Sequence, residues 1–344
     1  MIKAGIVGLG FMGRMHFNVL RNMENVTVTS LCDIDAAKRS GDWLNVRGNV
    51  DDPRAGQVDL AGTATFEDYR ELIEKADTSL IVVTTPTFLH SEIAVAALNA
   101  AKDVIVEKPM ALSVEQADQM LDAAEKSGKL LFVAQCIRFW PDYMVARDII
   151  RSKAYGKVKS AMFRRLGGAP KWCWEGWYLD ARRSGGTILD LHVHDVDYIQ
   201  NVFGVPPQVS SIGTIDVSCN HGAVDHVITH YHYPDGPAVT AQASWYIGNV
   251  AFAMEFVIAL EKATLSFGGG NRLTIHLPDG QAQQPELPPG DGYSTEIEYF
   301  IEAISKRLPP DRMPPVEARN NIAIAMAERE AVITGRPTAV SART

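Results

Sequence analysis

The chain has 344 residues, 46% of them hydrophobic and 22% charged, which is enough to build two domains with ordinary cores. Its formal net charge of −8 argues against a nucleic-acid partner, because recognition of phosphates depends on clustered Lys and Arg. The four cysteines are far apart and form no C-x-x-C motif, which indicates a reduced, cytoplasmic chain without a thiolate zinc site. We find no signal peptide and no apolar run of about 18–20 residues, so we expect no membrane partner.

Residues 1–138 alternate short apolar runs with helical patterns, which predicts right-handed βαβ units and a parallel sheet covered on both faces. Residues 41–62 interrupt this alternation and are expected to form a long surface insertion. We therefore predict an N-terminal, doubly wound α/β domain of the Rossmann type over residues 1–138. The expected strands are residues 3–9, 26–33, 79–86, 102–109 and 129–136, and the expected helices are residues 13–22, 90–101 and 113–128.

The pattern changes over residues 139–344, where several strands follow one another with few helices between them. Such runs predict an α+β domain with a large, mainly antiparallel, open-faced sheet. An open face usually needs a cover, so we expect a homodimer or homotetramer that associates through this sheet. The final helix, residues 316–334, is expected to pack back onto the first domain. The expected strands are residues 157–166, 208–217, 225–233, 238–247, 252–260, 262–267 and 272–277.

The segment GLGFMG follows a predicted strand and opens a predicted helix, which is the setting that a dinucleotide-binding G-x-G-x-x-G motif requires. Gly8 allows a tight turn, Gly10 allows the backbone to approach a pyrophosphate, and Gly13 allows helix and strand to pack closely. The phosphates would then lie at the positive end of the helix. A glycine-rich turn without a ligand is the alternative.

The second predicted strand ends at Asp33, 20 residues beyond Gly13, where an acidic residue is expected to bind a ribose diol. A carboxylate there would repel a 2′-phosphate, so we expect NAD rather than NADP. Lys38 and Arg39 lie close enough in sequence to keep NADP as the second possibility. The residues predicted to bind the cofactor in this half are Gly8, Gly10, Phe11, Met12, Gly13, Asp33 and Ile34.

The segment VIVEKPMAL places a Lys–Pro pair at the carboxyl end of a predicted strand, the edge where doubly wound sheets bind ligands. Pro109 disfavours helix at Lys108, so the ammonium group could project from the strand end into a cleft. A solvated lysine in a loop is the alternative.

The segment GGTILDLHVHDVDY is predicted to begin one helix of about five turns that continues to Phe203. Residues four apart share a helix face, so Asp190 and His194 should line up, followed by Asp197. His192 lies about 200° around the helix from His194, so the H-x-H pair cannot bind one metal ion. A structural hydrogen bond beneath the helix is the alternative role for Asp190 and His194.

Three further histidines, His226, His230 and His232, fall on one face of a predicted strand. No cysteine and no paired carboxylate accompanies them in sequence. We therefore interpret them as part of a sheet face at a subunit contact, and we predict no metal site.

In their order along the chain, GLGFMG, Asp33, TTPTFLH (84–90), EKP (107–109) and GGTILDLHVHD (185–195) together resemble the Gfo/Idh/MocA family of NAD(P)-dependent sugar and inositol oxidoreductases. The resemblance covers nearly the whole chain, and EKP with the later D-x-x-x-H is its specific part. It implies that Lys108 contacts both the nicotinamide ribose and the substrate, and that Asp190 and His194 complete the catalytic set. It also implies that the nicotinamide side of the pocket is formed by Thr84, Thr85, Pro86, His90 and Glu107.

The chemistry that fits these residues is hydride transfer. His194 would remove the proton of a substrate hydroxyl, since the ordinary pKa of an imidazole is about 6.5. Lys108 would stabilise the developing alkoxide, and Asp190 would position the substrate or His194.

The substrate is expected to be a cyclic polyol, a sugar or a sugar derivative. The segment KWCWEGWYLD offers aromatic faces that stack well on sugars, although at least one of Trp172, Trp174 and Trp177 is expected to serve packing. Arg138 stands where many relatives carry an Asn/Arg-rich segment, so it is expected to contact a hydroxyl. The predicted substrate-binding residues are Lys108, Arg138, Trp174, Trp177, Asp190 and His194.

Two other functions remain open at this stage. One is a non-catalytic sensor that binds NAD, and the other is a glycosidase that keeps NAD bound and oxidises a sugar transiently. The retained Lys108, Asp190 and His194 favour an enzyme over the sensor.

Overall fold

The computed structural model describes residues 1–48, 56–248 and 250–343. The chain forms two compact units. The first contains Met1–Ala134, Trp172–Glu175 and Tyr293–Arg319, and the second contains Gln135–Lys171, Gly176–Gly292 and the segment from Asn320 onward.

The division differs from the expected one in its C-terminal part. The first junction falls at Gln135, close to the expected boundary after residue 138. Residues 293–319, however, belong to the first unit, although the prediction assigned them to the second domain. The final helix, α11 (Pro315–Thr334), begins in the first unit and continues in the second from Asn320.

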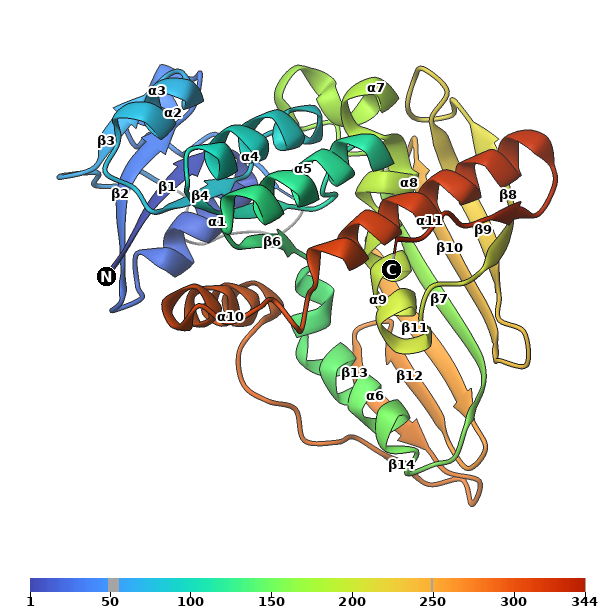
Figure 1. Ribbon diagram of the computed structural model, residues 1–344. Helices are drawn as coiled ribbons and strands as arrows, with labels where there is room; N and C mark the ends of the chain where they lie inside the picture. Colours follow the sequence, from blue (N-terminus) through green and yellow to red (C-terminus); the bar gives the residue numbers. More distant parts are fainter. Residues whose placement is uncertain (49–55, 249, 344) are drawn as a thin grey trace. The chain divides into compact units, whose positions relative to one another are not determined.

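The first unit is built on a six-stranded sheet in the order β3-β2-β1-β4-β5-β6, with every pairing parallel (Figure 1). This is the doubly wound order of the dinucleotide-binding fold. The central strands β4 and β5 are buried at every residue, as expected of a parallel sheet covered on both faces. The strands are β1 (Ile2–Val7), β2 (Val26–Cys32), β3 (Ala64–Phe66), β4 (Leu80–Val83), β5 (Asp103–Glu107) and β6 (Leu131–Ala134).

The helices of this unit begin and end where local signals place them. In α5 the side chain of Ser113 accepts a hydrogen bond from the Gln116 backbone N–H, and Gly128 ends the helix in the left-handed conformation. The helical segments are α1 (Phe11–Leu20), α2 (Ala36–Arg39), α3 (Tyr69–Lys75), η1 (Thr87–Leu89), α4 (His90–Asn99), α5 (Val114–Ser127) and α10 (Gly292–Lys306).

The segment 41–62 is more than a surface insertion. Its Trp43 is fully buried, packs edge-on against Phe17 with ring centroids 5.0 Å apart, and donates a hydrogen bond to the Lys38 carbonyl. An isolated β-bridge joins Asp42 to Gln57. A large aromatic side chain therefore anchors the segment on α1, while residues 49–55 lie outside the described part of the chain.

The second unit is built on a nine-stranded sheet in the order β14-β13-β12-β11-β7-β10-β9-β8-β15. All of its pairings are antiparallel except that of β7 with β10, as predicted for a mainly antiparallel sheet. The strands are β7 (Val158–Gly168), β8 (Gln208–Ile215), β9 (Val224–His232), β10 (Ala238–Tyr246), β11 (Ala253–Leu260), β12 (Thr264–Gly268), β13 (Asn271–His276), β14 (Ala282–Gln283) and β15 (Thr338–Ala339).

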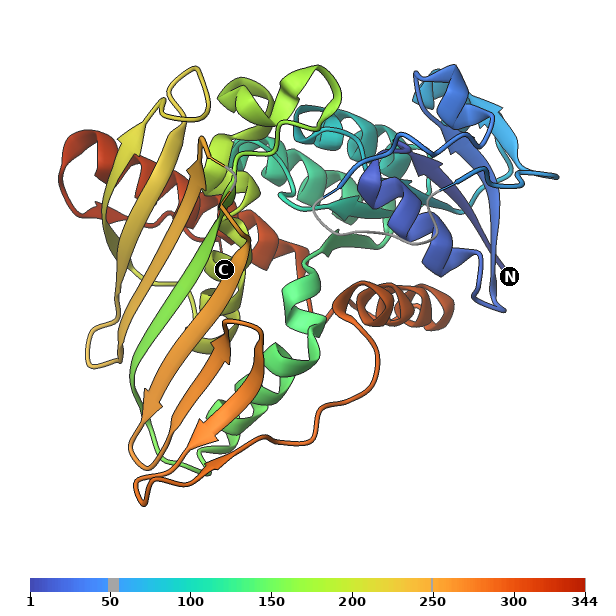
Figure 2. The same cartoon turned by 180° about the vertical axis from the view of Figure 1, so that it is seen from behind.

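Helices cover one face of this sheet, and Figure 2 shows it from the side away from α9 and α11. The uncovered side, which we call the open face, carries apolar side chains that are largely exposed: Ile212 (71%), Met162 (53%), Ile228 (46%) and Val257 (41%). The helical segments are η2 (Cys136–Phe139), α6 (Pro141–Ser152), η3 (Trp174–Leu179), α7 (Ala181–Ser184), α8 (Gly186–Asp190), α9 (Val193–Phe203) and the main part of α11.

Candidate functional site

The glycine-rich loop joins β1 to α1 and fits the role predicted for it. Gly8 has a φ of +97°, and a Cβ atom there would lie 2.7 Å from the Thr84 carbonyl oxygen. A Cβ atom on Gly13 would lie 2.0 Å from the Gly8 oxygen, so helix and strand could not approach as they do. By contrast, a Cβ atom on Gly10 would meet no atom within 4 Å, which leaves open space at the N-terminus of α1. The loop therefore has the free approach that a dinucleotide pyrophosphate needs.

Asp33 follows β2 directly and is held by backbone N–H groups. Its Oδ2 atom accepts a hydrogen bond from the Leu9 N–H at 2.7 Å, and its Oδ1 atom accepts one from the Asp35 N–H at 2.9 Å. A carboxylate with two such bonds still has lone pairs for a ribose diol. The Lys38 ammonium lies 3.6 Å from Oδ2, and the Arg39 guanidinium donates to the Asp33 carbonyl oxygen.

The other residues predicted beside the cofactor differ in exposure. Phe11 is buried, and its ring lies where a Cβ atom on Gly48 would stand. Met12 lines a small cavity together with Tyr293, whereas Ile34 is 62% exposed. If Phe11 and Met12 contact the cofactor, they would therefore do so through their backbone atoms at the start of α1.

His90, the first residue of α4, connects the two loops that follow β4 and β5. Its Nδ1 atom lies 2.9 Å from the Pro109 carbonyl oxygen and its Nε2 atom 2.8 Å from that of Thr85. The side chain is 1% exposed, and burial lowers its pKa below the ordinary value, although the two carbonyl groups act in the opposite direction. The ring of His90 thus lies between the carbonyl oxygens of Thr85 and Pro109, and its predicted place beside the nicotinamide stays a prediction.

Glu107 ends β5 and forms a buried pair with a residue that the sequence reasoning missed. The Nε2 atom of His16, on α1, lies 2.7 Å from Glu107 Oε1, and both side chains are less than 10% exposed. Glu107 Oε2 also accepts a hydrogen bond from the Lys108 backbone N–H. His16 sits three residues after Gly13, but nothing in its helical pattern distinguishes it from a packing residue.

Lys108 stands between two buried residues and is itself partly exposed. The Lys108–Pro109 peptide bond is cis. The residues on either side of Lys108 both have buried partners, Glu107 with His16 and the Pro109 carbonyl oxygen with His90.

Residues 186–203 of the second unit, which include Asp190 and His194, form two helices instead of the single helix that the sequence predicted. Helix α8 ends at Asp190 and α9 begins at Val193, so Leu191 and His192 form a joint between them. The N–H groups of Leu191 and His192 both bond to the carbonyl oxygen of Thr187, which ends the regular pattern. Asp190 and His194 therefore do not share one face of a continuous helix, and the spacing argument was wrong on this point.

Exposure singles out His194 within this stretch. All residues from 186 to 200 are described, and His194 is the one among them that is not buried; Asp190 is 9% exposed. A polar side chain that reaches solvent from an otherwise buried stretch is available to a ligand, which agrees with the role predicted for His194.

Asp197, which was predicted to line up with this pair, is 0% exposed and is bound by other side chains. Both of its oxygens accept hydrogen bonds at 2.7 Å from the Arg138 guanidinium, and Oδ1 also accepts one from the Asn321 amide. Arg138 is only 2% exposed. Its guanidinium therefore forms a buried ion pair, which explains its position without the substrate hydroxyl that it was predicted to contact. Arg165 and Asp195 form a second such pair.

The tryptophans divide into exposed and packed side chains. Trp172 and Trp174 are 40% and 45% exposed, whereas Trp177 is partly buried and stacks on Tyr178 with ring centroids 3.9 Å apart. Trp174 thus keeps the exposed face that sugar stacking requires, and Trp177 is at least partly a packing residue.

The histidines on β9 form no chelating set. The rings of His230 and His232 are neighbours at 4.6 Å, and His232 forms a hydrogen bond with Ser210. Across the described residues, no three or more His, Cys, Asp or Glu side chains are grouped so that they could hold a metal ion.

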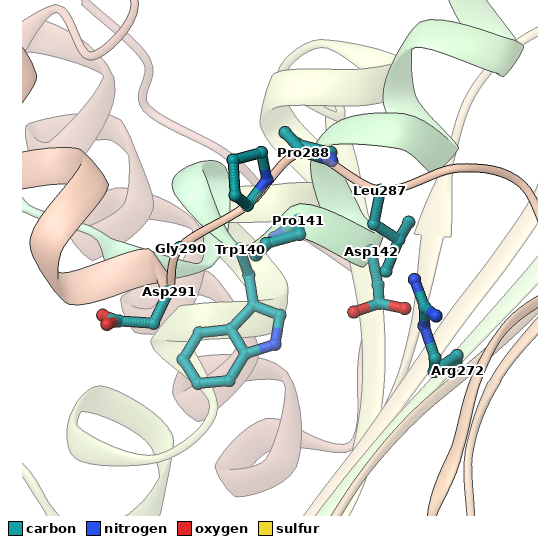
Figure 3. Close-up of a pocket in the computed structure, with 9 residues that line it drawn as sticks. Trp140, Pro141, Asp142, Arg272, Leu287, Pro288, Gly290 and Asp291 are labelled. Carbon is teal, nitrogen blue, oxygen red and sulfur yellow. The ribbon is translucent and has the colours of Figure 1, made fainter.

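The second unit also contains an open cavity of about 390 Å³, lined by residues 140–142, Arg272 and 287–291. Figure 3 shows the Trp140 indole and the Asp142 carboxylate on its walls. Asp142 Oδ1 accepts a hydrogen bond from the Leu273 N–H at 2.8 Å, which ties α6 to β13. The cavity contains none of the predicted site residues.

Two family models match the chain. The model described as an oxidoreductase family with an NAD-binding Rossmann fold matches residues 2–135, and the Gfo/Idh/MocA C-terminal domain matches residues 143–266. The chain belongs to the Gfo/Idh/MocA family. Its first unit is therefore an NAD-binding Rossmann domain, and the protein is an oxidoreductase.

Similar proteins cover almost the whole chain. A myo-inositol 2-dehydrogenase of Thermotoga maritima is 26% identical over 326 residues, with 90% of each chain covered. The scyllo-inositol 2-dehydrogenase (NAD(+)) of Bacillus subtilis is 25% identical, with 98% of this chain and 95% of that protein covered. Among solved structures, levoglucosan dehydrogenase in complex with NADH and levoglucosan has a TM-score of 0.81 at 20% identity, with 99% of each chain covered. This last similarity supports the fold. Among the described helices, none is long and apolar enough to cross a bilayer.

Proposed function

We propose that this protein is an NAD-dependent dehydrogenase that acts on a secondary hydroxyl of a cyclic polyol, a sugar or a sugar derivative. The observation that carries the proposal is the partial exposure of His194 in a stretch that is otherwise buried. Oxidation of an alcohol releases the hydroxyl proton, and an accessible imidazole is well suited to accept it. The inositol dehydrogenases among the relatives support the polyol class.

Bound NAD supplies the hydride acceptor for this chemistry. The groups that would hold it are the backbone around Gly10, the N-terminus of α1 and the carboxylate of Asp33. Asp33 favours NAD, and the Lys38 ammonium beside it keeps NADP as the less favoured cofactor.

Each catalytic residue has one task in this mechanism. His194 takes the proton from the substrate hydroxyl oxygen while the C–H bond of the same carbon is broken. Lys108 stabilises the negative charge that develops on that oxygen. Asp190 orients either His194 or a neighbouring hydroxyl group of the substrate.

The test is NADH formation across a panel of inositols, aldoses and glycosides, with NAD and NADP compared for each. We expect turnover of at least one polyol, and a loss of about 10²- to 10⁴-fold in kcat for His194→Ala and Lys108→Ala with NAD still bound. Near-wild-type turnover by either variant would overturn these roles. Release of an aglycone without net NADH would indicate the redox glycosidase, and NAD binding without any turnover would indicate the sensor.

We also propose that the protein is a homodimer or homotetramer that associates through the open face. Ile212 lies opposite Ile228, and Met162 lies opposite Val257, in neighbouring strands. Exposed apolar side chains gathered on one face are typical of a contact with a second protein, and a two-fold axis makes one such face complementary to itself. None of the four cysteines, all of which are described, is in a disulfide bond, which supports the proposal that the protein works in the cytoplasm.

A further inference from the structure

Three fully buried polar side chains of the second unit meet beside the joint between α8 and α9. They are His192 in the joint, Tyr231 on β9 and Glu328 on α11, and each is 0% exposed. The His192 Nε2 atom lies 3.4 Å from Glu328 Oε1 and 3.1 Å from the Tyr231 hydroxyl oxygen. We call this group the buried cluster; the mechanism above uses none of its members.

The charges around His192 favour its protonated form. Burial, the largest single influence, would lower its pKa, but the Glu328 carboxylate acting together with Asp195 raises the pKa above the ordinary value. The other charged groups that act on His192 are Asp195, which raises its pKa, and Arg165, which lowers it. Burial and the Glu328 carboxylate raise the pKa of Tyr231 far above its usual range, so the phenol stays neutral.

Such a pair needs an explanation, because the cost of desolvating two charges largely cancels their attraction. Well-packed apolar residues would stabilise the same position at least as well. The pair is therefore better explained by the positions that it imposes on neighbouring residues than by a contribution to stability.

That geometry concerns the joint itself. The His192 N–H bonds to the Thr187 carbonyl oxygen at the end of α8, and the His192 carbonyl oxygen accepts the N–H groups of Asp195 and Val196 in α9. His192 thus closes one helix and opens the next, with Asp190 two residues before it and His194 two residues after it. Figure 1 shows α11 running beside these two short helices.

We propose that His192 is a positioning residue, held by Glu328 and Tyr231, that sets the angle of the α8–α9 joint and thereby aims Asp190 and His194. This inference rests on the proposed function, in which those two residues carry the acid–base chemistry. Glu328 acts from α11, so a residue far along the chain controls the direction of the catalytic imidazole.

The test uses Glu328→Gln, His192→Asn and the double variant, with Asp142→Asn as the matched control. Asp142 is also a buried carboxylate of the second unit, but it bonds to Leu273 and lies outside the buried cluster. We expect Glu328→Gln to lower kcat by about 10- to 100-fold with an unchanged KM for NAD, because a small misplacement of a catalytic group is enough for such a loss. Asp142→Asn should lower the melting temperature without a comparable loss of kcat.

Coupling within the cluster gives a second readout. If His192 and Glu328 act as one unit, the double variant should be no slower than the slower single variant. Additive losses in kcat, or equal losses in Glu328→Gln and Asp142→Asn, would overturn the proposal.

The pH dependence gives a third readout. A His192 pKa raised in the folded state means that the pair is intact at low pH and is lost as pH rises through that value. We therefore expect an alkaline fall in wild-type kcat that moves to lower pH in Glu328→Gln. An alkaline limb that does not move would count against the role of His192.

Amide hydrogen exchange separates this inference from the proposed function, because it needs no turnover. In Glu328→Gln, residues 186–196 should lose protection, whereas in Asp142→Asn the loss should fall on residues 271–275. If the wild-type protein turns over no polyol, the proposed function fails and the exchange pattern alone decides the inference. Unchanged protection of residues 186–196 in Glu328→Gln would refute it.

Discussion

The two units hold their polar site residues by different means. In the first, Asp33 accepts two backbone N–H groups and His90 lies between two backbone carbonyls, although His16 and Glu107 also form a side-chain pair. In the second, side chains hold one another in buried pairs, as in Asp197 with Arg138 and His192 with Glu328.

This difference has a consequence for substitution. A backbone partner persists when a neighbouring side chain is changed, whereas a side-chain partner is lost with one substitution. The polar residues around the α8–α9 joint should therefore be far more sensitive to single changes, and to protonation, than those around the glycine-rich loop.

The largest effect is expected from Asp197→Ala. The substitution leaves the buried Arg138 guanidinium without its bidentate partner, and breaking a buried pair in this way costs about 3–5 kcal/mol of unfolding free energy. Urea denaturation should show the loss. Replacing both residues by leucine should recover most of it, and a cost of less than about 1 kcal/mol for the single variant would contradict the comparison.

The next effect is an opposite response of the two units to pH. Burial lowers the pKa of His90, so the folded first unit resists protonation and should lose stability as pH falls below about 6.5, by up to about 1.4 kcal/mol per pH unit. The raised pKa of His192 gives the second unit the reverse trend, with stability lost as pH rises.

Hydrogen exchange measured at several pH values can follow both units in one sample. Residues 84–110 report on the first unit and residues 186–196 on the second. In His90→Gln the acid sensitivity of residues 84–110 should disappear. A common pH trend in the two regions would show that these histidines do not control it.

A moderate effect is expected on the choice of cofactor. Asp33→Asn removes the charge that repels a 2′-phosphate and leaves Lys38 beside the site. The ratio of kcat/KM for NADP to that for NAD should rise about tenfold, equivalent to about 1.4 kcal/mol. Asp35→Asn is the control, because Asp35 caps α2 through the Ala37 N–H. An equal shift in both variants would refute the role of Asp33.

The smallest effect on stability is expected from Ile212→Lys, since surface substitutions usually change it by less than about 0.5 kcal/mol. Its effect on association should be large, because Ile212 is the most exposed of the apolar side chains on the open face. Sedimentation velocity should then show monomers. Leu44→Lys is the matched control, with 60% exposure outside the sheet. An unchanged oligomer in Ile212→Lys would place the interface elsewhere.

The sequence predicted the first unit better than the second, for a physical reason. The alternation of strands and helices and the tasks of Gly8 and Gly13 follow from local patterns and sterics, which are visible in a few neighbouring residues. The break at His192 depends on Tyr231 and Glu328, which are distant in sequence, so helical periodicity alone predicted one continuous helix. The pair of His16 with Glu107 escaped prediction for the same reason.

The exposed fraction of a histidine side chain likewise cannot be predicted from the spacing of residues along the sequence. The sequence already singled out His194 over His192 as the candidate base, but the partial exposure of the first and the full burial of the second follow from the packing of their neighbours. The protein partners of Arg138 and Trp177, an ion pair with Asp197 and a ring contact with Tyr178, could likewise not be predicted from the sequence pattern.

The open space at Gly10 gives a way to separate folding from ligand binding. The residue has φ −75° and ψ −163°, a conformation open to any amino acid, and a methyl group there would touch no atom within 4 Å. Gly10→Ala should therefore yield a folded protein whose only obstacle is to the incoming dinucleotide. Such a variant would be a folded form of the enzyme that does not bind the dinucleotide. It would serve as the reference for measurements of cofactor binding and of amide hydrogen exchange.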